Sequence, residues 1–169
     1  MLISEIGADG DPLNTKPNWK LNIYREKAIF YVSVACSLLI TLTLIAIDAA
    51  SPIALLAPLL FKHFLCDYLL QSSSMLSQKH DLRALGGYLH SGLHALGSAL
   101  ILMFFVSWWT VLLIVALEFI VHLLLDFGKA QWVRKLELSE TNLRYWHLFG
   151  LDQWLHALTY LVMAAVVFR

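Results

Sequence analysis

Charged residues are scarce in this chain, and those present cancel. Lysine and arginine number 12, aspartate and glutamate also 12, and together they make up 14% of the 169 residues. Nucleic-acid-binding proteins normally present a basic face, so we expect no nucleic-acid partner. The chain has only two cysteines, Cys36 and Cys66, which is too few for a disulfide framework or a zinc ribbon. Both lie within apolar runs and are expected to be small buried hydrophobic side chains.

Hydrophobic residues dominate instead, at 59% of the chain with a mean hydropathy of +0.69, which is typical of a membrane protein. A spanning helix needs about 20 mostly apolar residues. Five segments meet that length, at about residues 28–47, 52–71, 84–106, 111–129 and 151–168. The sequence therefore predicts an all-α, polytopic transmembrane bundle of about five helices, in a single domain over residues 28–169.

A polar segment, residues 1–27, precedes the first apolar run and is expected to be a cytoplasmic tail. It is longer than the charged region of a cleaved signal peptide, so we expect the first helix to be retained. With the amino terminus inside, ten of the twelve lysines and arginines fall in the tail, the cytoplasmic connectors and the helix ends beside them. The positive-inside rule then predicts that the amino terminus lies inside and the carboxyl terminus outside.

Four of the expected helices each carry two metal-ligating side chains four residues apart. That spacing places both side chains on one helix face, one turn apart. Successive helices alternate in direction, and the pairs lie near the ends of the second and fourth and near the starts of the third and fifth. All four pairs are therefore expected at one level, within about 15 Å of the cytoplasmic ends. They are His63 and Asp67, His90 and His94, His122 and Asp126, and Asp152 and His156.

Five imidazoles and three carboxylates are enough to bind two divalent metal ions, with positions left for water or substrate. Antiparallel bundles build dinuclear sites from such inward pairs. We expect zinc, with manganese or iron as alternatives. The competing interpretation is that these side chains only hydrogen-bond neighbouring helices. Because each unpaired ionisable group is costly in lipid, four pairs at one depth favour metal binding.

Other polar residues lie close to these pairs in the sequence. Glu118 is one turn deeper than His122 and is expected to be a ninth ligand, an acceptor for an imidazole N–H, or a catalytic base. An ordinary interhelical hydrogen bond is the alternative. Gln71 and Gln153 are expected to donate hydrogen bonds to the ligands. Three basic residues at the cytoplasmic mouth are expected either to bind an anionic head group or to serve as interfacial anchors: Lys79, Arg83 and Lys129.

The series "HFLCDYLLQ", "HLLLDFGK" and "DQWLH", with Lys79 and His94 between, resembles a bacterial membrane-protein family known only as domain of unknown function 3307. The resemblance covers about residue 52 to the carboxyl terminus and implies a location in the bacterial cytoplasmic membrane. It implies no reaction. It does imply that nine positions belong to the family's pattern: His63, Asp67, Gln71, His122, Asp126, Lys129, Asp152, Gln153 and His156. More loosely, the chain is similar to bacterial membrane-bound metal-dependent hydrolases.

Three functions compete at this point. A metal-dependent hydrolase acting on a membrane lipid or another lipophilic substrate fits the mixed histidine and aspartate ligands and their depth near the head groups. A di-iron lipid hydroxylase or desaturase is the first alternative. A metal-ion or proton transporter is the second, but the outer half of each helix is almost entirely apolar. A b-type haem explains two imidazoles and leaves three aspartates unexplained. The sequence leaves the oligomeric state open.

Overall fold

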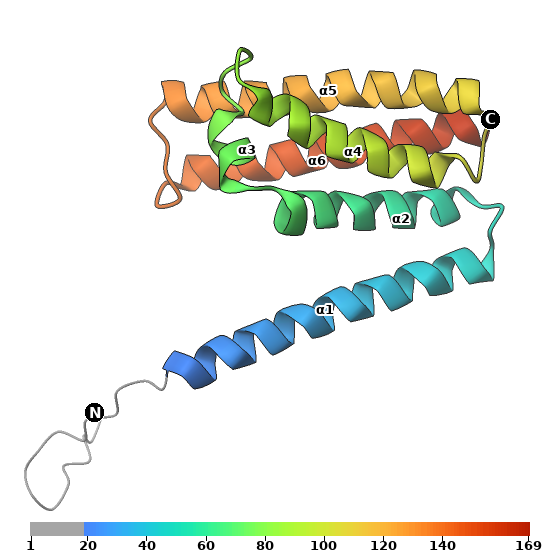
Figure 1. Cartoon of the computed structure of the whole chain (residues 1–169), viewed down its shortest axis with the longest axis horizontal. Helices are drawn as coiled ribbons and strands as arrows, with labels where there is room; N and C mark the ends of the chain where they lie inside the picture. The colour runs from blue at the N-terminus through green and yellow to red at the C-terminus, as the bar shows by residue number, and fades with distance from the viewer. Residues whose placement is uncertain (1–18) are drawn as a thin grey trace, which may run out of the picture. The chain divides into compact units, whose positions relative to one another are not determined.

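The computed structural model describes residues 19–169, which form helices joined by short connectors (Figure 1). No strand occurs in this part of the chain, so the all-α prediction is confirmed. The elements in order are α1 (Trp19–Ile47), α2 (Pro52–Leu65), a π-helical turn η1 (Cys66–Leu70), α3 (Ser73–Gln78), α4 (Leu85–Leu102), α5 (Trp108–Lys135) and α6 (Leu143–Val167).

Within the described residues, four helices are long and apolar enough to cross a membrane, which supports a membrane protein: Glu26–Ile47, Pro52–Leu70, Trp108–Lys135 and Leu143–Val167. The span expected over residues 84–106 is not among them. Its helix, α4, ends at Leu102 and has 18 residues, which include four glycines, two histidines and two serines. The histidines and serines are buried against the other helices, whereas leucines such as Leu89 and Leu96 face outward.

The chain divides inside α1, between Leu39 and Ile40, into two units that are described separately. In the first unit, α1 begins at Trp19 and not near residue 28. Residues 1–18 of the predicted tail lie outside the described residues. Cys36 is exposed on α1, so the prediction that it is buried is wrong, whereas Cys66 is buried as predicted. The predicted domain, residues 28–169, extends across both units.

Within residues 40–169, four helices form the bundle. Helix α2 packs against α4 and α6, and α5 packs against the same two helices. Successive bundle helices run in opposite directions, so the end of α2, the start of α4, the end of α5 and the start of α6 lie at one end of the bundle (Figure 1). The short helix α3 packs against α4 at that same end.

The opposite end of the bundle is an apolar core. Leu55, Leu59 and Leu102 are fully buried there, and side chains from the first turns of α5 and the last turns of α6 complete the cluster. This tightly packed end excludes water, so a polar group buried there would lack a partner.

A close approach of backbones positions α3. A Cβ atom on Gly86 of α4 would lie 2.7 Å from the Cβ of Gln78 and 3.0 Å from the carbonyl oxygen of Ser74, so only glycine fits. The Gly86 N–H donates a hydrogen bond to the Gln78 side chain at 2.9 Å. This contact holds the end of α3 against the bundle, and Lys79, the residue that follows it, is buried.

Candidate metal centre

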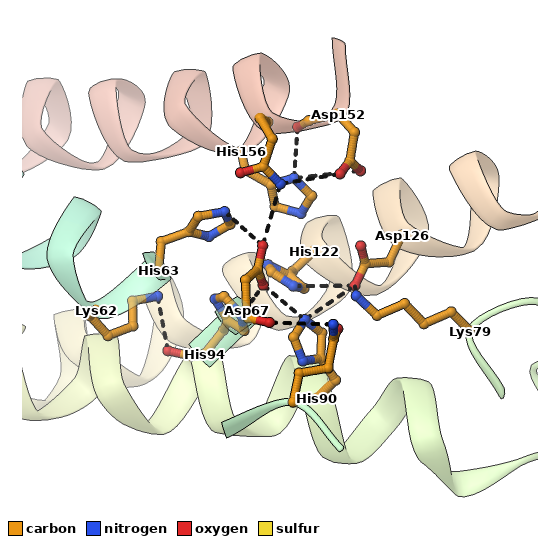
Figure 2. A network of polar contacts seen from close by, with 12 residues as sticks. Lys62, His63, Asp67, Lys79, His90, His94, His122, Asp126, Asp152 and His156 are labelled. Atoms are coloured by element: carbon orange, nitrogen blue, oxygen red, sulfur yellow. Dashed lines mark hydrogen bonds and ion pairs between the residues drawn. The ribbon is translucent and has the colours of Figure 1, made fainter. Parts of the chain in front are cut away.

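The eight side chains predicted to bind metal lie together in the polar half of the bundle (Figure 2). They come from α2, η1, α4, α5 and α6, as the alternating helix directions predicted. Seven of the eight residues are buried, and the eighth, Asp67, has a side chain that is 15% exposed. The structure therefore brings together one cluster and not four separate pairs.

Asp67 lies at the centre of this cluster, among the histidines (Figure 2). One carboxylate oxygen, Oδ1, is 3.1 Å from Nε2 of His94 and 3.3 Å from Nε2 of His90, and Oδ2 is 3.2 Å from Nε2 of His63. Asp67 belongs to η1, and π-helical turns are rare and frequent at functional sites. Spacing in the sequence gives no sign of this turn, which changes the direction of the Asp67 side chain.

The imidazole rings are in contact with one another. Ring centroids of His94 and His122 are 3.9 Å apart, those of His122 and His156 are 4.3 Å apart, and those of His90 and His94 are 4.6 Å apart. Two groups within the cluster offer ligand atoms within 4.8 Å of one another and can hold a metal ion. One group is Asp67, His90, His94 and His122, and the other is His122, Asp126 and His156.

Several ligand atoms in the cluster have no hydrogen bond despite being buried. They include Nε2 of four histidines: His63, His90, His122 and His156. Three of these nitrogens lie 3.2, 3.3 and 3.4 Å from a carboxylate oxygen, in orientations that form no hydrogen bond. In a tetrahedral zinc site with bonds of about 2.0–2.1 Å, neighbouring ligand atoms lie about 3.4 Å apart. The donor types, the separations and the unsatisfied nitrogens therefore fit a metal ion.

Two lysines neutralise carboxylates at the edge of the cluster. Nζ of Lys79 is 2.8 Å from Oδ2 of Asp126, and Nζ of Lys129 is 2.7 Å from Oδ2 of Asp152. Nε2 of His90 and Nε2 of His122 approach the same Asp126 oxygen, at 3.5 and 3.4 Å, and neither nitrogen has a hydrogen bond.

The three basic residues predicted near the cluster differ in exposure. Lys79 is buried in its ion pair and lines a pocket together with Lys129, whereas Arg83 is exposed. Lys129 is the more accessible of the two paired lysines, with 20% of its side chain exposed. The short helix α3, which the sequence pattern did not reveal, is what brings Lys79 into the bundle.

Sequence reasoning missed two further residues, Lys62 and Tyr160. Nζ of Lys62 is 2.9 Å from Oε1 of Glu118, 3.0 Å from the Tyr160 hydroxyl and 3.2 Å from the His94 carbonyl oxygen. The same hydroxyl is 3.1 Å from Nδ1 of His63, so it joins this ion pair to the imidazoles. A lysine inside an apolar helix requires a partner, and that requirement was the available signal.

The remaining predicted residues divide into near and distant neighbours of the ligands. Gln153 donates hydrogen bonds to Asp67 at 3.3 Å and to Asp152 at 3.4 Å, as expected of a residue that orients them. Gln71 instead donates to the backbone oxygen of Asp67, at 3.4 Å. Glu118 lies outside both candidate metal groups and accepts hydrogen bonds from Lys62 and, at 2.9 Å, from Ser98.

The fold and the site define an all-α protein in which residues 40–169 form a bundle with a core rich in histidine and aspartate, and in which four of the described helices are able to cross a membrane. Residues 55–169 match the family described as "Protein of unknown function (DUF3307)", and the chain belongs to that family, which confirms the resemblance. The match includes every residue of the cluster. No curated protein and no solved structure matches the chain.

Proposed function

We propose that this chain is an integral membrane metalloprotein that hydrolyses an ester of a membrane lipid or another lipophilic substrate, using two divalent metal ions. The observation that carries the proposal is the set of buried imidazole nitrogens without hydrogen bonds, three of them 3.2–3.4 Å from a carboxylate oxygen. Leaving several polar atoms unsatisfied in a low-dielectric core is costly, and a bound cation removes that cost.

Two ions, zinc in our proposal, suit the donors. Asp67, His90 and His94 would hold one, and His122, Asp126 and His156 would hold the other, because one Nε2 lone pair of His122 binds a single ion. His63 and Asp152, the other two of the eight predicted ligands, lie beside these groups and contact Asp67 and His156. Three donors per ion leave a position for water or substrate, as catalytic zinc sites require.

Metal ions at this centre would supply Lewis acidity, which polarises an ester oxygen and makes a water molecule more acidic. In the hydrolysis, the water oxygen bonds to the carbonyl carbon or the phosphorus, the ester C–O or P–O bond breaks, and a water proton ends on the leaving oxygen. Asp67 and Lys129 are the residues at which substrate would enter, because their side chains keep 15% and 20% exposure. Gln153 would hold Asp67 and Asp152 in place.

The apolar end of the bundle favours an enzyme over a transporter. A path for ions or protons needs polar groups through the whole bundle. Leu55, Leu59 and Leu102 fill the end opposite the cluster and are fully buried. No polar path then crosses the described bundle, which favours chemistry on a substrate that reaches the cluster from the lipid.

For the location, we propose the bacterial cytoplasmic membrane with the amino terminus inside and the carboxyl terminus outside. Ten of twelve basic residues then fall on the cytoplasmic side, and the cluster lies near that face. The alternating directions of α2, α4, α5 and α6 are compatible with that arrangement.

Elemental analysis of the chain purified in mild detergent tests the proposal. We expect about two equivalents of zinc or manganese per chain, and lipid hydrolysis that stops on chelation and returns with the metal. Iron with a visible charge-transfer band would instead favour a lipid hydroxylase or desaturase. Protein without metal, even when expressed in metal-supplemented medium, would overturn the metalloprotein.

A further inference from the structure

An apolar groove of about 200 Å³ lies between α5 and α6, beside the cluster. Leucines from both helices line it together with Gly128 and Trp132, and its only charged residues are Lys129 and Asp152. The groove therefore lies between two helices able to cross a membrane. Its lining includes Lys129 and Asp152, the ion pair at the edge of the candidate metal centre.

Lys129 can serve a second partner besides Asp152. Its ammonium group has three donors, and the contact to Asp152 at 2.7 Å uses one of them. The side chain of Asp152 is 3% exposed and that of Lys129 is 20% exposed, so the open side of this ion pair is the ammonium side. An oxygen atom of a ligand in the groove would meet a cation there.

The charges of the cluster indicate the sign of that ligand. Four carboxylate side chains and three lysines surround the imidazoles, and the side chains of all seven are at most 20% exposed. These seven side chains together carry one excess negative charge, which is smaller than the charge of a single divalent ion. With two ions bound, the centre would have a net charge of about +3, and an anionic ligand would offset it in this low-dielectric setting.

We infer that the groove binds an acyl chain of an anionic phospholipid whose phosphate contacts Lys129, and that such lipids are the substrate class. This inference rests on the proposed metal-dependent hydrolase for the substrate class and for the positive charge of the centre, while the groove and the partly exposed Lys129 are features of the structure itself. The phosphate oxygens accept hydrogen bonds from the ammonium group, and the leucines of α5 and α6 contact the chain.

Native mass spectrometry of the delipidated full-length chain tests the lipid site, with three probes that separate chain from phosphate. Dioleoylphosphatidylglycerol has both, dioleoylglycerol has the chains alone, and glycerol 3-phosphate has the phosphate alone. We expect phosphatidylglycerol to bind most tightly. Lys129→Met should weaken phosphatidylglycerol about 10- to 100-fold, the usual effect of losing a charged hydrogen bond, and leave dioleoylglycerol unchanged. Lys129→Arg should retain most of the affinity.

Gly128 offers an independent test of the groove. A Cβ atom there meets nothing within 4 Å, so Gly128→Phe and Gly128→Leu fill the groove without a backbone clash. Both should weaken the two lipids alike. Gly128→Ala controls for helix propensity, and Gly150→Phe places the same ring in open space outside the groove. Arg134→Met removes an exposed cation from the same end of α5 and should leave lipid binding unchanged.

Equal weakening of both lipids by Lys129→Met, or unchanged binding in both groove-filling variants, would overturn the inference. So would glycerol 3-phosphate binding as tightly as the lipid, which would indicate a site for free phosphate. Metal content measured on the same samples keeps the two proposals apart. Bound metal without a preference for the anionic lipid contradicts only the inference, and that preference without metal contradicts only the metalloprotein.

Discussion

The Lys62 ammonium group lies 2.9 Å from the Glu118 carboxylate, and their side chains are only 8% and 1% exposed. The pair joins α2 to α5, and its contact with the Tyr160 hydroxyl at 3.0 Å extends it to α6. A Cβ on Gly97 of α4 would meet the Lys62 side chain at 2.7 Å, so α4 leaves room for the lysine. This ion pair therefore involves all four bundle helices, between the apolar core and the imidazoles.

Removing one partner of this pair should destabilise the bundle strongly. Lys62→Met leaves the Glu118 carboxylate unpaired in the core, and Glu118→Gln does the same to the ammonium group, so each should lower the free energy of unfolding by about 3–5 kcal/mol. The double variant Lys62→Met with Glu118→Leu should recover most of that loss. Unfolding in detergent, analysed as a double-mutant cycle, measures the coupling. Additive losses would show that the two charges do not stabilise each other.

Glu118→Gln also separates a metal ligand from a base. Because Glu118 lies outside both candidate metal groups, we expect the metal content to stay unchanged. A fall in lipid hydrolysis of about 10²–10⁴ with metal retained would identify a general base acting through Lys62 and Tyr160. Loss of the metal from protein that remains folded would instead make Glu118 a ninth ligand and contradict the position seen here. Elemental analysis and turnover on one preparation provide both results.

Replacing His122 should have the largest effect on metal content of any single ligand change, because this imidazole belongs to both candidate groups. We expect His122→Ala to lose at least one of the two proposed ions. His147→Ala is the matched control, since it removes an exposed imidazole outside the cluster. His147 lies near the start of α6, the helix that also carries Asp152 and His156. Equal metal content in the two variants would exclude His122 as a ligand.

The sequence was sufficient to predict the all-α class and the meeting of the eight predicted ligands at one level. Two residues spaced by four lie on one face of a helix, and alternating helix directions bring the four pairs to one depth in the bundle. The common level of the pairs therefore follows from local sequence pattern. The partners of Lys62 and Lys79 could not be predicted in this way. Which side chains meet across helices depends on the rotation of each helix about its axis and on close approaches such as Gly97 against Lys62.

Two local features also had no sequence signal that we used. The π-helical turn at η1 replaces the last turn of an expected helix and sets the direction of Asp67. The short helix α3 lies between the second and third expected helices, where no helix was predicted, and Ser72 accepts a capping hydrogen bond from the Met75 N–H at 3.2 Å. Ser72 is therefore the cap of this helix.

A topology reporter tests the proposed orientation. A fusion after Arg169 should read as extracytoplasmic, and one within the α5 to α6 connector, at Glu140, as cytoplasmic, because the basic residues concentrate on the connector side. Each position is fused in turn to a reporter that is active only in the cytoplasm and to one that is active only outside it. Activity of one of the two reporters at each position shows that the fusion protein is expressed. The reverse pattern would place the cluster, and any lipid it acts on, at the outer face.

The packing of α3 can be tested at Gly86, with Gly92 of the same helix as a matched control. A Cβ on Gly86 would lie 2.7 Å from the Cβ of Gln78, whereas one on Gly92 meets nothing within 4 Å. Gly86→Ala should therefore destabilise the chain by about 1–3 kcal/mol, the usual cost of overpacking. Gly92→Ala should be neutral or stabilise it by up to about 1 kcal/mol, because alanine favours the helix.

The same comparison reports on Lys79, because displacement of α3 moves its ammonium group away from Asp126, now 2.8 Å away. Lys79→Met removes that group directly and leaves the packing of α3 on α4 intact. If the ion pair holds Asp126 in position for metal, then Gly86→Ala and Lys79→Met should both lower the metal content, and Gly92→Ala should not. Unfolding and elemental analysis of the three variants decide the point. Equal stability of the two alanine variants would show that α3 does not depend on this contact.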